Sequence, residues 1–169
     1  MEFDWDQVKQ EIKKGNLSLD ELILILLYIG KISGKNRLQQ EVFLVWKEIF
    51  KEKYLIDPMF QPDFYGPHSQ LLEDLILKLN TVGYVRKSPR GEGHVTYIIT
   101  EKGKFFIKKI LEEKKIPDEL FNKLRDKKMD WDELTFQGLI RYICRNYPEY
   151  FIKEEEMLKE KVIVWWIIR

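Results

Sequence analysis

A short basic segment carries side chains that are suited to bind an anion. Arg86, Lys87 and Arg90 lie close together, His94 follows a glycine-rich turn, and Glu92 is the one acidic residue among them. Guanidinium and ammonium groups bind the phosphates of a nucleic acid, which positions a protein without reading the base sequence. On a hairpin, these side chains could point together toward one phosphate strand. Basic runs of this size are also common on surfaces that bind nothing, so an ordinary charged hairpin is the alternative.

A second group of polar residues lies around the start of a predicted helix. His68 precedes Ser69, the expected N-cap, and Gln70 and Lys78 lie on the outward face of that helix. Free N–H groups and the helix dipole favour anions at such a terminus, so His68 could contact a phosphate or a base. Gln70 could read adenine, and Lys78 could read guanine or bind a phosphate. These four residues join the basic segment as candidate nucleic-acid contacts.

The same helix face also carries residues that oppose DNA binding. Glu73 and Asp74 are adjacent carboxylates, which would repel phosphates. The alternative interpretation is a solvated helix face of the kind found on most surface helices. In that case His68 only covers the turn before the helix, and we favour this structural role for it.

Residues that could perform catalysis or bind a metal are scarce. The chain has two histidines and one cysteine, and His68, His94 and Cys144 lack the short ligand spacing typical of zinc sites. Cys144 follows Ile143 in a predicted helix and is expected to be a small core residue. No phosphate-binding loop, G-x-G-x-x-G, G-x-S-x-G or H-E-x-x-H motif occurs. We therefore expect no enzyme activity, no metal and no cofactor.

Composition narrows the class of protein further. A net charge of +1 on 169 residues creates no global field that attracts nucleic acid. One cysteine excludes a disulfide within the chain, which fits a reducing cytoplasm. The segment from Met1 to Lys14 is charged throughout, unlike a signal peptide. The apolar runs Leu22 to Ile29 and Val162 to Ile168 are too short to cross a bilayer. Abundant Lys and Glu without any alanine favour a thermophilic source.

The elements that position these side chains follow from hydrophobic spacing and capping residues. A capping box at Ser18 and Glu21 opens a central apolar helix. Thr100 is expected to cap a later helix with Phe105 in its buried stripe. Asp130 with a glutamate three residues later is expected to open another helix. The pattern predicts helices over residues 4–14, 18–29, 37–51, 69–82, 101–114, 118–128 and 130–145, with strands over residues 84–88 and 94–100.

Three helices, a hairpin and a further helix form the order of a winged helix-turn-helix domain. The predicted fold class is therefore mostly α with a small β-hairpin (α+β), with added helices at both ends. Residues 1–116 are assigned to the winged-helix domain with its N-terminal helix. Residues 117–169 are assigned to a C-terminal helical extension that packs on this domain or forms a dimer interface.

Three segments carry a resemblance to a known family. They are "NRLQQEVFLVWKEIF", "FYGPHSQLLEDLILKLNTVGYV" and "YIITEKGK", which together lie between Asn36 and Lys104. They resemble the YwgA-like winged-helix proteins, most of which are uncharacterised. The Gly-Pro turn before a helix is also similar, more distantly, to the Panacea domain of SocA-like antitoxins. The resemblance implies the winged-helix fold and leaves the activity open.

The end of the chain is strongly apolar. Trp165, Trp166 and Ile168 are expected to form a homodimer interface or to pack on Trp5 and the helix around it. The first hypothesis is a cytoplasmic, homodimeric winged-helix transcriptional regulator that binds double-stranded DNA. The second is a protein-interaction module, antitoxin-like or an assembly adaptor, which uses the same scaffold without DNA. Glu73 and Asp74 favour the second hypothesis, whereas the basic hairpin favours the first.

Overall fold

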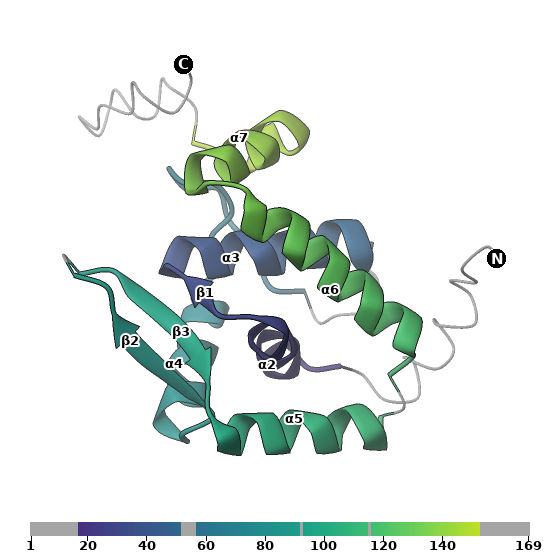
Figure 1. Cartoon of the computed structure of the whole chain (residues 1–169). Helices are drawn as coiled ribbons and strands as arrows, with labels where there is room; N and C mark the ends of the chain where they lie inside the picture. The colour runs from purple at the N-terminus through teal and green to yellow at the C-terminus, as the bar shows by residue number, and fades with distance from the viewer. Residues whose placement is uncertain (1–16, 52–56, 92, 115, 153–169) are drawn as a thin grey trace.

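The computed structural model describes residues 17–51, 57–91, 93–114 and 116–152 (Figure 1). The predicted first helix and the apolar tail with Trp165, Trp166 and Ile168 lie outside the described residues. Helices dominate the described part and accompany a small antiparallel sheet, so the predicted α+β class is confirmed. In chain order the elements are α2 (Leu19–Ile29), β1 (Ile32–Ser33), α3 (Lys35–Leu44), the π-helix η1 (Val45–Ile49), α4 (Gln70–Thr81), β2 (Val85–Pro89), β3 (Val95–Ile99), α5 (Glu101–Glu113), α6 (Asp118–Glu133), α7 (Phe136–Asn146) and the 3-10 helix η2 (Pro148–Tyr150).

Helix α2 lies at the centre of the molecule, between α3, α5 and α6 in Figure 1. The predicted capping box is present, because Ser18 Oγ accepts from Glu21 N and the Glu21 carboxylate accepts from Ser18 N. All residues from Leu22 to Leu27 are buried, so this helix has no polar face. It contacts α4, α5, α6 and β3. A helix that is apolar on every side is stable in water only when it is surrounded in this way.

The helices and strands from α2 to β3 follow the order of a winged-helix core, α–β–α–α–β–β. The sheet order is β1-β3-β2, and both pairings are antiparallel. The two predicted strands of the hairpin are confirmed as β2 and β3. Strand β1 was not predicted. It has only two residues, Ile32 and Ser33, which pair with Tyr97 and Thr96 and are too few to show alternation.

The predicted helix over residues 37–51 is divided in the structure. Helix α3 ends at Leu44, and the chain continues as one turn of π-helix, η1, in which Phe50 N donates to Val45 O at 2.9 Å. The predicted buried stripe is confirmed at Leu38, Val42, Val45, Trp46 and Ile49. The polar residues Gln39, Gln40 and Glu41 are also buried. Their burial shows that α3 is enclosed on its polar side as well.

The predicted buried stripe of α5 is wrong at Phe105. Thr100 caps it as expected, because its Oγ1 accepts from Gly103 N at 3.1 Å. Phe105, which was predicted to be buried, is 75% exposed, whereas Ile107 is fully buried. The reason is the close approach of the helix at Gly103 to the backbone just before β2, where an added Cβ would lie 2.3 Å from Tyr84 O. The buried face therefore follows positions 103 and 107.

The predicted break between two helices near Asp130 is wrong. Helix α6 runs without interruption from Asp118 to Glu133, and α7 begins after Thr135, whose Oγ1 accepts from Gly138 N. The inward stripe of α6 consists of Leu120, Leu124, Lys128 and Trp131, all of them buried. A lysine inside this stripe hides its periodicity, because charged residues usually lie on the surface.

An aromatic cluster joins α7 and η2 to the winged-helix core. The Phe43 ring lies 5.2 Å from those of Phe60 and Tyr147 and 4.7 Å from that of Tyr150, between centroids. Lys47 Nζ lies 5.0 Å from the centroid of Tyr150, a favourable distance for a cation–π contact. The extension between Asp118 and Phe151 is thereby packed against the core.

Candidate nucleic-acid interface

The start of α4 is fixed by its N-cap. Ser69 is fully buried, and its Oγ accepts from Leu72 N at 3.3 Å and donates to Pro58 O. The predicted cap is therefore confirmed. A hydroxyl that is buried and committed to the cap is not presented to a ligand, so Ser69 acts here by positioning the helix.

Two of the three segments that carry the family resemblance are in direct contact. Gln39 Nε2 donates to Ser69 O, and Ser69 N donates to Gln39 Oε1, each at 2.9 Å. Gln40 Nε2 donates to Tyr65 O, also at 2.9 Å. The amide side chains in the middle of α3 thus hold the backbone just before α4. This contact fixes the angle between the two helices of the helix-turn-helix unit.

The Gly-Pro turn before α4 is covered by the C-terminal extension. Gly66 has a φ of 98°, and a Cβ at this position would lie 3.0 Å from the ring of Phe151. Asp63 and Phe151 also form an isolated parallel β-bridge. The glycine is required both by the backbone conformation and by the ring that covers it.

His68 lies between two carboxylates. Its Nε2 atom is 3.7 Å from Glu73 Oε1, and its Nδ1 atom is 4.0 Å from Asp63 Oδ2. The side chain is about one-third exposed. The structure therefore places His68 beside the turn, between two carboxylates.

The outward face of α4 presents both polar and apolar groups. Gln70 and Asp74 are exposed, and Gln70 Nε2 donates to Asp74 Oδ1 at 3.1 Å. Leu77 is 57% exposed at the middle of the face. Lys78 is exposed, and its Nζ lies 3.6 Å from Asp20 Oδ2, in the first turn of α2. Each of these groups is accessible to a ligand, since the contacts among them are at the surface.

The pleat of the hairpin separates two of the basic residues that were expected to act together. Arg86 pairs with Ile98 and Lys87 pairs with Tyr97, so the two side chains leave opposite faces of the sheet. The expectation that the basic side chains all point toward one phosphate strand is therefore corrected for Arg86. Lys87 lies on the face that is directed toward α4.

The tip of the hairpin presents the remaining pair. Arg90 N donates to His94 O at 2.8 Å, and both side chains are exposed. Together with Ser33 and Gly34 they line an open depression of about 380 Å³. Arg90 and His94 are thus brought together, as the sequence predicted, at the end of the wing.

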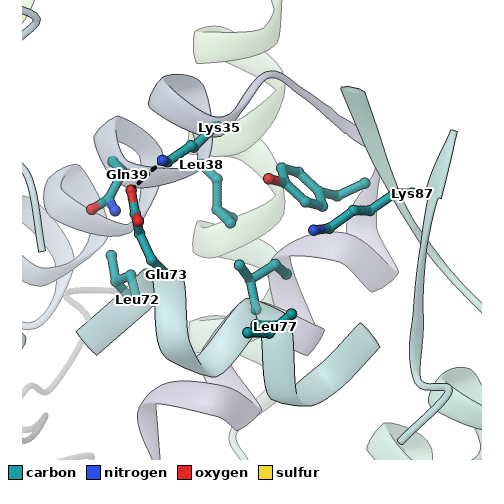
Figure 2. A pocket seen from close by; sticks show the side chains of 9 residues that line it. Lys35, Leu38, Gln39, Leu72, Glu73, Leu77 and Lys87 are labelled. Carbon is teal, nitrogen blue, oxygen red and sulfur yellow. Dashed lines mark ion pairs between the residues drawn. The ribbon is translucent and has the colours of Figure 1, made fainter. Parts of the chain in front are cut away.

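A second depression, of about 190 Å³, lies between the start of α3, helix α4 and the sheet. Figure 2 shows Lys35 and Glu73 on one side of it and Lys87 reaching in from the other side. Lys35 Nζ lies 2.6 Å from Glu73 Oε1. The sequence did not indicate Lys35, because no local pattern connects it with α4. The full lining is Lys35, Leu38, Gln39, Leu72, Glu73, Ile76, Leu77, Lys87 and Tyr97.

A network of buried ions joins α3 to α6 away from these surfaces. Lys128 and Glu41 are both fully buried, and Lys128 Nζ lies 3.4 Å from Glu41 Oε2 and 2.8 Å from Asp132 Oδ2. Arg37 Nε donates to Glu41 Oε1 at 3.0 Å, and its terminal nitrogens donate to the carbonyls of Leu134 and Trp131. Arg37 therefore binds carbonyls at the C-terminal end of α6, while Lys128 and Glu41 join the two helices below the surface.

Burial raises the pKa of Glu41 to about 7, with the Asp132 carboxylate adding to the effect and Lys128 and Arg37 opposing it. A carboxyl whose pKa is higher in the folded than in the unfolded protein stabilises the fold at low pH, and this stabilisation is lost as the pH rises. We expect wild type to lose up to ~3 kcal/mol of unfolding free energy relative to Glu41→Gln between about pH 4.5 and pH 7. Urea denaturation of both proteins across this range measures the difference, and parallel pH profiles would contradict it.

Other kinds of site are not found in the described part of the chain. Within it, no group of three or more His, Cys, Asp or Glu residues is arranged to hold a metal ion. Cys144 is partly buried in α7. No described helix combines the length and the apolar character that a membrane span requires.

Comparisons with known proteins returned no match to a family model, a curated protein or a solved structure. The resemblance to YwgA-like proteins therefore stays a prediction, and the function must be argued from the site itself.

Proposed function

We propose that this chain is a cytoplasmic winged-helix DNA-binding protein that acts as a transcriptional regulator. The observation that carries the proposal is the position of the basic side chains around α4. Lys35 at the start of α3 and Lys87 on β2 flank the depression beside α4. Arg90 and His94 extend the basic surface to the tip of the wing. In this fold the third helix enters the major groove while the wing contacts the backbone.

The exposed face of α4 supplies groups that can contact base edges. Gln70 can read adenine, and the exposed Leu77 can contact the methyl group of thymine. The negative charge of Glu73 is partly compensated in the free protein, since Glu73 is paired with Lys35, whereas Asp74 accepts a hydrogen bond from the neutral Gln70. In the free protein, this pairing lowers the repulsion between the helix and an approaching phosphate.

The salt dependence of DNA binding tests this proposal. We expect affinity for a short random-sequence duplex to fall steeply with salt, with a log–log slope of about −0.9 for each phosphate that is neutralised. Replacing Lys87 and Arg90 together with alanine should make that slope shallower by about 1.8. Fluorescence anisotropy at several salt concentrations measures both values.

The matched control removes the same charge elsewhere. Lys109 on α5 and Arg125 on α6 are exposed and lie in ion pairs with acidic residues of their own helices. The double variant Lys109→Ala and Arg125→Ala should leave the slope unchanged. Undetectable binding at low salt, or an equal loss of slope in the control, would contradict the proposal.

A protein-interaction module is the second candidate function, and the second depression favours it. Its floor consists of buried apolar residues of α3 and α4, and the exposed Leu77 lies at its edge. An apolar side chain of a partner protein would fit this surface. If DNA does not bind, loss of a co-purifying protein from the Leu77→Asp variant would support this function instead.

A further inference from the structure

The ion pair between Lys35 and Glu73 lies where the proposed function requires a phosphate contact. Lys35 Nζ is 2.6 Å from Glu73 Oε1, and the Lys35 side chain is 58% exposed. Glu73 is more enclosed, and its Oε1 atom is buried without a hydrogen-bond partner in the described residues. The contact thus has the distance of an ion pair but lacks the alignment of a hydrogen bond. An exposed pair of this kind is readily exchanged for another partner.

The depression beside Glu73 carries two lysines that can bind a phosphate. Lys35 and Lys87 approach the depression from opposite sides, and Glu73, on the same side as Lys35, is the one acidic residue among those that line it (Figure 2). A second basic partner for Glu73 is already in place, because His68 Nε2 lies 3.7 Å from the same Oε1 atom. Glu73 would therefore keep one polar neighbour if Lys35 moved away.

We propose that Glu73 acts as an internal substitute for a DNA phosphate, and that binding transfers Lys35 from Glu73 to the DNA backbone. This inference rests on the proposed function of the same surface. In the free protein Glu73 holds Lys35 beside α4, whereas in the complex with DNA Lys35 neutralises a phosphate. Because the Lys35–Glu73 pair must break before Lys35 can bind a phosphate, the protein binds DNA of any sequence less tightly than it would without Glu73. Glu73 is therefore a residue that limits non-specific binding.

Two single variants distinguish this transfer from a permanent ion pair. If Lys35 moves to the DNA, Lys35→Met should make the salt slope shallower by about 0.9, because one phosphate contact is lost. Glu73→Gln should raise the affinity about two- to fivefold, the range for one exposed ion pair, and should leave the slope unchanged. If Lys35 stays on Glu73 in the complex with DNA, the two variants exchange their effects on the salt slope. Lys35→Met then leaves the slope unchanged, and Glu73→Gln makes it steeper by about 0.9.

A double-mutant cycle supplies the control. Asp74 is the adjacent carboxylate, and its contact in the structure is with Gln70 rather than with a lysine. The gain from Glu73→Gln should shrink in the Lys35→Met background, whereas the gain from Asp74→Asn should be the same in both backgrounds. Thermal unfolding of each variant establishes that it is folded.

The outcomes separate this inference from the proposed function. A slope that responds to Lys87 and Arg90 but not to Lys35 overturns the transfer and leaves DNA binding intact. Equal coupling of Lys35 to Glu73 and to Asp74 also overturns it. Absence of DNA binding by wild-type protein overturns both proposals together.

Discussion

Replacing Lys128 with alanine is expected to lower the free energy of unfolding by about 3–5 kcal/mol. Lys128 is fully buried and contacts both Glu41 and Asp132. Without the ammonium group, the fully buried Glu41 carboxylate keeps only Arg37 as a cationic partner. Removal of one partner from a buried ion pair is costly because the other group must either remain charged and desolvated or take up a proton. The lost methylene groups leave a cavity that adds to the effect.

Chemical denaturation of wild type and variant at neutral pH measures this loss. The double variant Lys128→Met and Glu41→Gln removes both charges and keeps most of the volume, so it should regain a large part of the stability. Lys109→Ala is the control, because Lys109 is exposed and pairs only with Glu113 in the described structure. Its change should stay within about 1 kcal/mol, as for most surface ion pairs. A comparable loss in the control, or none in Lys128→Ala, would contradict the importance of the buried pair.

The second large effect is expected at Gly103, where substitution with alanine should cost about 3 kcal/mol. The added Cβ would lie 2.3 Å from Tyr84 O and 2.8 Å from Ile99 Cγ1. Neither atom can move freely, since Tyr84 O accepts from Thr100 N and the Ile99 side chain is buried in the core. Helix α5 must therefore shift away from the base of the wing. The substitution would otherwise favour a helix, because alanine has the higher propensity.

Gly30→Ala provides the comparison for Gly103→Ala. Gly30 has an extended backbone, and its Cβ would make ordinary contacts at 3.7 Å or more. We expect a change below about 1 kcal/mol at this position. Thermal unfolding followed by circular dichroism distinguishes the two substitutions. Similar melting temperatures for both variants would show that the approach of α5 to Tyr84 is not a constraint on stability.

Much of the architecture could be predicted from local patterns. The helix starts at Ser18, Ser69 and Thr100 follow from side chains that accept from nearby backbone N–H groups, and the structure confirms all three. The hairpin follows from the change of period and the glycine-rich turn. These features depend on residues only a few positions apart, so local sequence patterns are enough to predict them.

The remaining features depend on residues that are far apart in the chain. The Lys35–Glu73 and Glu41–Lys128 pairs cannot be seen in any local window. The wrong break in α6 came from Asp130 and Glu133, which match a capping box although they lie inside one continuous helix. The orientation of α5 depends on a backbone carbonyl that only the tertiary structure brings close to Gly103.

The paired hydrogen bonds between Gln39 and Ser69 restrict which amino acids position 39 can tolerate during evolution. One side chain must donate and accept at the same time, and it must be long enough to reach the next helix. Glutamate offers only acceptors when ionised, and asparagine is one methylene shorter. Among the amide and carboxylate side chains, glutamine alone meets both demands, so replacement by one of the others requires a compensating change in the turn ahead of α4.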